Sequence, residues 1–306
     1  MPLSYDQISA ITEKKFIPKL ADNIFDSNPL LSRLKKKSYE KVEGGTVIMV
    51  PLNYAVTSAS GWYSGADTLS TTDNDVITAA EYSWKQCFAG ISITGLDERK
   101  NSGDRAILKL VKEKTKIAEK TLMDKLGTGV YSDGTDPKSI AGLRDIVASN
   151  QTVGGISQST YSWWAAQVDS STTTLTIAAM QARYNLATVN NDHPTVIATT
   201  RSIFNSYYAL LQPQQRFQDS ETAKGGFQNL MFNGAPVIAD SYCPASHMFF
   251  LNENYLHLFA HSDCDMKFEP FVKPVNQDVK VGRVLWMGAL GSSNNRLQAG
   301  LTAITA

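Results

Sequence analysis

Residues suited to burial recur every three or four positions between residues 104 and 126, which is the spacing of one face of an α-helix. They are Leu108, Val111, Thr115, Ala118, Leu122 and Leu126, and charged residues fill most of the positions between them. Asp104 is a good N-cap, and Gly127 can take the left-handed conformation that ends a helix. The pattern therefore predicts an amphipathic helix over 104–126, about 34 Å long, that serves as a spine for the rest of the chain.

Two predicted strands and a very long connection precede this helix. Residues 47–52 are mostly apolar, and residues 81–94 alternate between apolar and small polar side chains, as in a half-buried strand. The connection, residues 53–80, has roughly 28 residues, whereas hairpin loops usually have about 2–5. A loop of this length does not suit a compact domain. We interpret it as a long two-stranded arm that projects from the body.

Trp62 and Tyr63 lie in this polar connection. Large aromatic side chains are costly to leave in water and are common where one protein meets another. We expect both residues to contact another subunit. The alternative is that they fold back on their own chain.

The first 43 residues contain scattered apolar side chains that Pro18 and Pro29 divide into short pieces. Short helical turns joined by proline rarely form a core of their own. We therefore expect residues 1–43 to be an arm that lies against another surface, in the same chain or in a neighbour.

The remainder of the chain mixes helices and strands without a regular βαβ repeat. We predict a helix over 175–190, with Ile177, Met180, Tyr184 and Ala187 on one face. We also predict a helix over 203–211, ended by Pro213, and a mobile loop over 212–226. The predicted short strands cover residues 195–199, 228–232, 236–239, 247–251, 255–260, 267–272 and 283–290. This order indicates an α+β fold.

Composition narrows the range of functions. The 306 residues include 29 Lys and Arg and 29 Asp and Glu, so bulk charge does not favour nucleic-acid binding. The three cysteines are scattered and form no CxxC pair, which favours a reducing compartment over a disulfide framework. We find no apolar segment typical of a signal peptide or a membrane span, and we therefore expect a cytoplasmic product.

Candidate chemistry is sparse. The chain has no GxSxG, HExxH, GxxxxGK[ST] or GxGxxG motif. The best metal candidate is His257, His261 and Cys264, because histidines four residues apart share one face of a helix. However, the surrounding pattern is typical of a strand, and no fourth ligand has a suggestive spacing. We therefore predict no metal site, no cofactor and no catalytic residue.

Other charged groups give weaker signals. The carboxylates that cluster loosely in the last third of the sequence are Asp240, Glu253, Asp263 and Asp265. No His–nucleophile pairing accompanies them, so they do not indicate a catalytic site. The run Lys35–Lys36–Lys37 is typical of a solvated face, with weak and salt-sensitive contact to nucleic acid as the alternative.

The order of arm, projecting hairpin, long helix and α+β lobe resembles the major capsid proteins of tailed bacteriophages, which have the Hong Kong 97-type fold. The resemblance covers nearly the whole chain, and the order and spacing of its segments are more specific than any one of them. The resembling segments are ITEKKFIPKLADNIFDSNPLLSRLKKK, IAGLRDIV, GGISQSTYSWW, FQNLMFNGAPVIADSYCP, MFFLNENYLHLFAH and FVKPVNQDVKVGRVLWMGAL.

The resemblance implies a layout and a function. The layout is an N-terminal arm (1–43), an E-loop hairpin (44–96), a P-domain with the spine helix (97–172), an A-domain (173–262) and strands that return to the P-domain (263–306). The implied function is non-catalytic assembly of pentamers and hexamers into an icosahedral shell around double-stranded DNA, in the virion after assembly in the host cytoplasm.

Two features of some family members are not expected here. Residues 53–80 contain no lysine, so we predict no covalent cross-linking between subunits. The sequence begins directly with the arm, so we expect any scaffolding protein, like any portal or decoration protein, to be a separate partner. Three alternatives remain at this stage: an encapsulin-like nanocompartment shell with the same fold, a tail component, and an enzyme with an unrecognised site.

Overall fold

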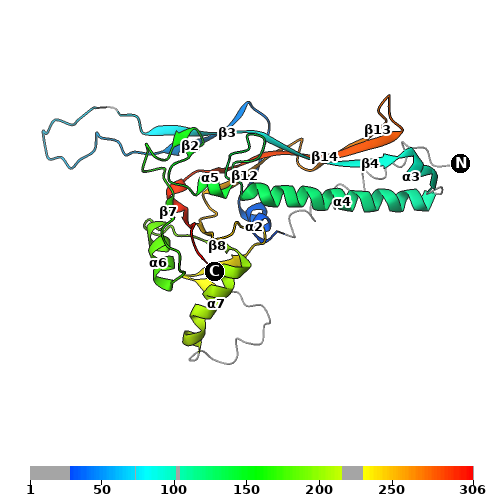
Figure 1. Ribbon diagram of the computed structural model, residues 1–306. Coiled ribbons are helices and arrows are strands. Elements are labelled where there is room, and N and C mark those ends of the chain that lie inside the picture. The colour runs from blue at the N-terminus through cyan, green and yellow to red at the C-terminus, as the bar shows by residue number, and fades with distance from the viewer. Residues whose placement is uncertain (1–27, 73, 101–103, 216–229, 306) are drawn as a thin grey trace.

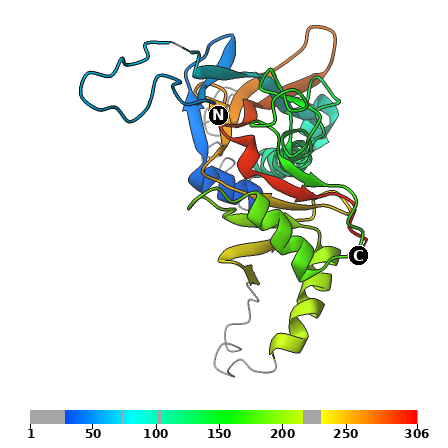
Figure 2. The same cartoon turned by 90° about the vertical axis from the view of Figure 1, so that its left-hand side faces the viewer.

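The computed structural model describes residues 28–72, 74–100, 104–215 and 230–305. Its strands form two large sheets, one long projecting hairpin and one short two-stranded sheet (Figure 1). Figures 1 and 2 both show the second sheet and its helices below the first. The mixed architecture confirms the predicted α+β class. None of the described helices is long and apolar enough to cross a membrane.

The first sheet is built around one long strand. Its five strands are β1 (Tyr39–Val42), β4 (Lys85–Thr94), β12 (Leu256–His261), β13 (Lys267–Val272) and β14 (Val279–Ser292). Strands β4, β12 and β13 all pair antiparallel with β14, and β1 runs parallel to β12. The predicted strand 283–290 is therefore only the middle of a strand of 14 residues.

The predicted spine helix is α4 (Asp104–Val130), which lies along the first sheet beside β4 (Figure 1). The predicted apolar face is confirmed for the described side chains, because the following residues of α4 are buried: Val111, Thr115, Ala118, Leu122, Leu126 and Val130. This face packs in one core with Ala89 and Ile91 of β4. The side chains of Asp104 and Leu108 lie outside the described residues.

The predicted end of this helix at Gly127 is wrong, because α4 continues to Val130. The ring of Tyr242 lies against Gly127, and a Cβ atom there would be only 2.9 Å from it. The Tyr242 hydroxyl also donates a hydrogen bond of 2.6 Å to Asp124. Gly127 therefore provides room for an aromatic ring beside the helix and does not cap it.

The projecting hairpin consists of β2 (Val47–Asn53) and β3 (Ile77–Ser83), paired from Val47↔Ser83 to Asn53↔Ile77. The predicted single strand 81–94 is wrong. Trp84 separates β3 from β4, which belong to different sheets, and its indole N–H donates to Gly45 O at 2.9 Å. The connection is also shorter than predicted, residues 54–76, because residues 77–80 belong to β3, among them the weak strand formers Ala79 and Ala80.

The second sheet has the strand order β7-β15-β11-β8-β10-β9. Its strands are β7 (Gln167–Asp169), β8 (Val196–Thr199), β9 (Met231–Phe232), β10 (Ala235–Ala239), β11 (Met248–Leu251) and β15 (Ala299–Leu301). The predicted strands 195–199, 236–239 and 247–251 correspond to β8, β10 and β11. Strands β7 and β15 were not predicted, because three-residue segments carry almost no periodic signal.

Helices α6 (Ile177–Leu186) and α7 (Arg201–Gln215) pack on this sheet in a second core. The predicted inner face of α6 is confirmed by the burial of Met180, Tyr184 and Ala187. Thr176 caps α6 and shortens the predicted helix at its start. The predicted stop before Pro213 is wrong, since α7 continues to Gln215. Most of the predicted mobile loop 212–226 lies outside the described residues.

The short elements fill the space between these layers. They are α3 (Gly95–Lys100), α5 (Leu143–Ile146), β5 (Thr152–Val153), β6 (Ile156–Ser157) and the 3₁₀ helix η2 (Asn295–Leu297).

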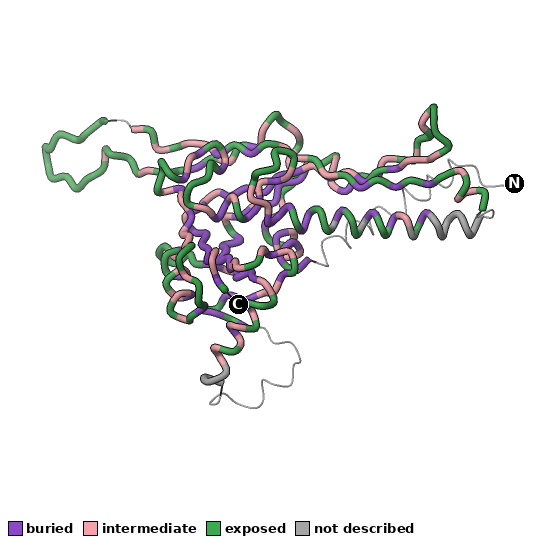
Figure 3. Tube along the Cα trace, viewed as in Figure 1, coloured by how far each residue is buried: buried purple, intermediate pink, exposed green. Residues whose placement is uncertain are grey.

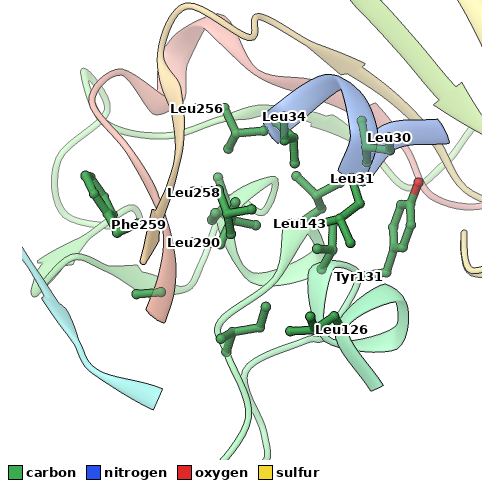
Figure 4. Close-up of a cluster of buried hydrophobic side chains, with 14 of the residues drawn as sticks. Leu30, Leu31, Leu34, Leu126, Tyr131, Leu143, Leu256, Leu258, Phe259 and Leu290 are labelled. Atoms are coloured by element: carbon green, nitrogen blue, oxygen red, sulfur yellow. The ribbon is translucent and has the colours of Figure 1, made fainter. Parts of the chain in front are cut away.

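The described part of the predicted N-terminal arm is helix α2 (Pro29–Lys37) followed by β1. Asn28 caps α2, and the proline that was expected to break the arm is its first helical residue, a position where proline is favoured. Leu30, Leu31 and Leu34 are buried and point into the main core (Figure 4). This helix is therefore part of the body, whereas residues 1–27 lie outside the described residues.

A buried carboxylate fixes α2 to the turn between β11 and β12. Arg33 donates to both oxygens of Glu253 at 2.8 Å, and Lys37 Nζ lies 3.0 Å from Oε2. Thr195 Oγ1 donates to the same carboxylate at 2.9 Å. The Glu253 side chain is fully buried, so these contacts replace the water that the charge has lost.

We predict that Arg33→Ala lowers the free energy of unfolding by about 2–3 kcal/mol, because it leaves the buried Glu253 carboxylate with fewer compensating contacts. Chemical denaturation of the isolated subunit measures this change. Arg283→Ala is the matched control, since its ion pair with Glu269 is largely exposed and is worth less than about 1 kcal/mol. Equal effects of the two substitutions would contradict the prediction.

Candidate assembly surfaces

The connection of the hairpin, residues 54–76, is the most exposed described segment of the molecule (Figure 3). None of its described residues is buried. Hydrogen bonds from Ser58 N–H to Asn74 and from Ser64 N–H to Asp67 give it some internal structure. These hydrogen bonds give the loop local structure, but the described side chains of the loop form no core.

The sequence-predicted contact residues Trp62 and Tyr63 lie in this loop with exposed fractions of 106% and 67%. Val56 and Leu69 of the same loop are also exposed. The described chain does not cover these side chains, so the loop presents apolar surface to solvent. Such surface is typical of a protein–protein interaction site.

The outer face of the first sheet carries a second exposed apolar surface. Helix α4 covers the face that bears Ala89 and Ile91, and Phe88 projects from the opposite face. Phe88 lies across from Leu285 of β14, and Val272 of β13 is exposed on the same sheet. One face of this sheet is therefore buried within the chain while the other remains open.

The predicted metal candidates do not come together. Residues 257 and 261 lie in strand β12, where four positions span about 13 Å, so the helical spacing that would unite them is absent. His257 Nδ1 lies 2.8 Å from Glu40, and His261 Nδ1 accepts the Asp263 N–H at 3.1 Å. The described residues include no cluster of three or more His, Cys, Asp or Glu that could hold a metal ion.

Three of the four clustered carboxylates of the sequence serve separate structural contacts. Asp240 is buried and accepts hydrogen bonds from the Tyr131 hydroxyl and the Tyr242 N–H, both at 3.0 Å. Asp265 pairs with Lys41 at 3.1 Å, and Glu253 holds α2 as described above. This arrangement pairs no nucleophile with a base.

Comparison with known proteins was informative only at the level of structure. No family model and no curated protein matches the chain. The capsid asymmetric unit of cyanophage A-1(L) superposes with a TM-score of 0.67 at 19% identity, over 91% of this chain and 93% of that one. The capsid of a native GTA particle gives 0.62 at 12% identity, with 90% of each chain covered.

The chain has the fold of phage capsid proteins. The holo-SrpI encapsulin complex from Synechococcus elongatus PCC 7942 also matches this capsid-protein fold, with a TM-score of 0.59, 10% identity and coverage of 90% and 87%. The match extends over nearly the full length of each protein. The fold expected from the sequence resemblance is therefore confirmed.

The cysteine thiols of this chain are poorly suited to nucleophilic chemistry. Cys87, Cys243 and Cys264 are all free, and burial raises the pKa of each thiol above its ordinary value. A raised pKa keeps a thiol protonated, and the thiolate is the reactive form. In the predicted lysine run, Lys36 and Lys37 are exposed, as expected of a solvated face, and Lys37 also forms an ion pair with Glu253.

The carboxyl group of Asp145 has a raised pKa. Burial, and then the negative charge of Asp133, raise the pKa of Asp145 to about 6. Asp145 lies in the short helix α5, and no described side chain forms a hydrogen bond with its carboxyl group. The shift is therefore a consequence of packing. It makes the folded state bind this proton more tightly than the unfolded state, whose aspartate pKa is about 3.9.

We predict that Asp145→Asn stabilises the protein at pH 7 by about 1–2 kcal/mol after allowance for solvent screening. The proton on Asp145 contributes stability that is full below pH about 4 and is lost as the pH rises through about 6. Urea denaturation between pH 4.5 and 7.5 measures the difference between wild type and variant.

Asp133→Asn provides the matched control. It removes the second cause of the shift, so the pKa of Asp145 should move toward its ordinary value and the pH dependence should shrink without vanishing. An Asp145→Asn variant with the same stability profile as the wild type would contradict the assignment.

Proposed function

We propose that this chain is a major capsid protein that self-assembles into an icosahedral head shell enclosing phage double-stranded DNA. The observation that supports this function best is the exposed hairpin connection, residues 54–76, on a body with the capsid-protein fold. A subunit that leaves Trp62 and Val56 in water gains free energy when a neighbour covers them. Many such weak contacts, made together, give a stable closed assembly.

We assign the parts of the subunit by analogy with the shell layout. Residues 1–43 are the N-terminal arm, 44–96 the E-loop hairpin, 97–172 the P-domain with the spine helix, 173–262 the A-domain and 263–306 the return to the P-domain. The packing of α4 on β4, which pairs with β14, supports the grouping of the spine with β14. The separate core of α6, α7 and the second sheet supports a distinct A-domain, although β15, which lies within 263–306, also contributes Ala299 and Leu301 to this core.

The proposed function is structural and non-catalytic, and it requires no cofactor. The separate roles of the carboxylates and the raised pKa values of the thiols support this view. The proposed partners are copies of the same chain in pentamers and hexamers, with separate scaffolding, portal and decoration proteins. Contact with packaged DNA is weak and non-specific, in keeping with a net charge of zero. The proposed location is the virion, after assembly in the host cytoplasm.

The similarity to an encapsulin supports one alternative, a nanocompartment shell that encloses a cargo protein. The two functions differ in what the shell contains. Neighbouring genes for a terminase or portal would favour the phage capsid, and a neighbouring peroxidase or ferritin-like gene would favour the compartment.

We predict that the chain, expressed with its genomic neighbours, forms closed icosahedral particles visible by electron microscopy. Particles that hold nuclease-protected double-stranded DNA support the capsid, whereas particles filled with a second protein support the compartment. A chain that stays monomeric under all these conditions, or that forms only tubes or rings, would contradict the proposed function.

We predict that the double substitution Trp62→Ala and Tyr63→Ala reduces shell yield by at least about tenfold, because it removes aromatic anchors of the kind that dominate protein interfaces. Sedimentation and electron microscopy measure the yield, and circular dichroism shows that the subunit is still folded. Trp62→Phe with Tyr63→Phe is the matched control, since it keeps the ring surface. Normal shells from the double alanine variant would show that these residues do not anchor a contact.

A further inference from the structure

Strand β3 has an outer edge that the hairpin itself does not use. The Tyr54 N–H donates to Val76 O at 3.1 Å, which fixes the alternation of hydrogen bonds along the β2–β3 ladder. Residues 78, 80 and 82 of β3 therefore bond to β2, while the backbone groups of residues 77, 79 and 81 point away from it. The Glu81 N–H confirms this alternation, because it donates outward to Gly154 O at 2.9 Å.

The turn between β5 and β6 covers only one end of this edge. Gly154 has a φ of +60° and lies so close to β3 that an added Cβ atom would be 2.7 Å from the Ala80 Cβ. This close approach ends at Glu81. Among the described residues, no backbone hydrogen bond outside the β2–β3 ladder reaches the outward groups of Ile77 and Ala79.

The opposite edge of the same hairpin is protected. Pro51 of β2 lies directly across from Ala79 and, by the same alternation, would point its N–H outward if it had one. Proline at such a position prevents another strand from pairing, and natural proteins use it to block sheet edges. The hairpin therefore has one blocked edge and one open edge.

The open edge borders a groove of about 600 Å³ that we call the β3-edge groove. Its lining residues include Tyr54, Ile77, Ala79, Tyr161 and Trp163. Trp163 stacks on Tyr54 with ring centroids 5.3 Å apart, and Tyr161 lies 6.1 Å from Trp163. This aromatic surface is partly exposed to solvent.

The charge of the β3-edge groove is negative. Asp75 and Glu81 line it, and no lysine or arginine does. Both carboxylates belong to exposed residues, and neither forms an ion pair with another described residue. Aromatic faces next to carboxylates attract a cationic side chain through both ring and charge.

We propose that the β3-edge groove binds an extended segment of a separate protein, which pairs with Ile77–Ala79 as an added strand and places an arginine or lysine against Tyr161 and Trp163. The backbone pairing supplies affinity, as in other cases of strand addition. The aromatic rings and the two carboxylates supply the preference for a basic side chain. The proposed occupant is a partner other than the shell subunit, so peptide binding can be tested independently of shell formation.

The test uses the full-length chain and a fluorescein-labelled peptide, Val-Thr-Arg-Thr-Val, with acetylated and amidated ends. Fluorescence anisotropy measures binding, and Val-Thr-Glu-Thr-Val is the control peptide. We expect the arginine peptide to bind at least about tenfold more tightly than the control, because like charges repel in the groove. We also expect binding to weaken between about 0.05 and 0.5 M salt. Equal binding of the two peptides would overturn the proposal.

Ala79→Pro tests the added strand, because it removes one outward N–H and leaves the bonds to β2 in place. It should weaken binding about tenfold. Ala79→Ser, which retains the N–H, should bind as the wild type does. Circular dichroism and the thermal midpoint show whether the proline variant is folded.

A second measurement applies if the proline variant does not fold. The arginine peptide, methylated on the backbone nitrogens that face β3, should lose binding to the unmodified protein. The double variant Asp75→Asn and Glu81→Gln should bind the unmethylated peptide more weakly and with little dependence on salt. Unchanged affinity of the methylated peptide would overturn the strand pairing, and unchanged salt dependence would overturn the role of the carboxylates.

Shell formation by Ala79→Pro identifies the occupant. Normal shells combined with lost peptide binding support a separate partner. A folded proline variant that no longer forms shells would mean that a neighbouring copy of the chain occupies the edge, which overturns the proposed occupant. Failure of the wild type to form shells contradicts the proposed function but leaves the peptide measurements unaffected.

Discussion

The pairing of β14 with three other strands holds the subunit together. Its hydrogen bonds run to β4 through residues 279–288, to β13 through 281–285 and to β12 through 288–292. One half of β14 thus supports the surface on which α4 lies, and the other half joins the body through β12 and β1. Because backbone groups in a buried sheet must be paired, a break in β14 would separate the extended part of the molecule from its core.

The body and the hairpin connection are stabilised in different ways. The body has two continuous cores, and the Glu253 carboxylate connects α2 to the turn between strands of the two sheets. The described residues of the segment 54–76 include no buried side chain and form only local hydrogen bonds. A well-packed body with an exposed hairpin connection suits an assembly in which each subunit keeps its fold while this connection adapts to different neighbours.

The sequence predicts best those helices and strands in which a periodic pattern of apolar residues continues over many residues. The buried stripe of α4 and the inner face of α6 could be identified because several turns repeat the same pattern. The helix end predicted at Gly127 was wrong, because this glycine makes room for the ring of Tyr242, which is more than a hundred residues away in the chain. The division between β3 and β4 was missed for a similar reason, as strand partners decide it and local propensity does not.

The two candidate surfaces also differ in how far the local sequence reveals them. Trp62 and Tyr63 stand out in the sequence because large aromatics are unusual in a long polar loop, and their exposure requires no knowledge of distant segments. The β3-edge groove was not visible in this way. It arises only when Trp163 and the Gly154 turn fold beside the hairpin, and neither has a local signal that relates it to β3.

Whether the edge of a sheet is blocked or open to another strand bears on the proposed assembly. A protein that assembles as we propose needs edges that pair only with intended partners, since open strands otherwise promote aggregation. Pro51 blocks β2, and β13 carries Pro270 within the irregular part of its register between Glu269 and Val272. The segment Ile77–Ala79 differs from these two strands because its outward backbone groups are open. Its position beside an acidic aromatic groove restricts which strands can use it, so selectivity there comes from the groove and not from the backbone.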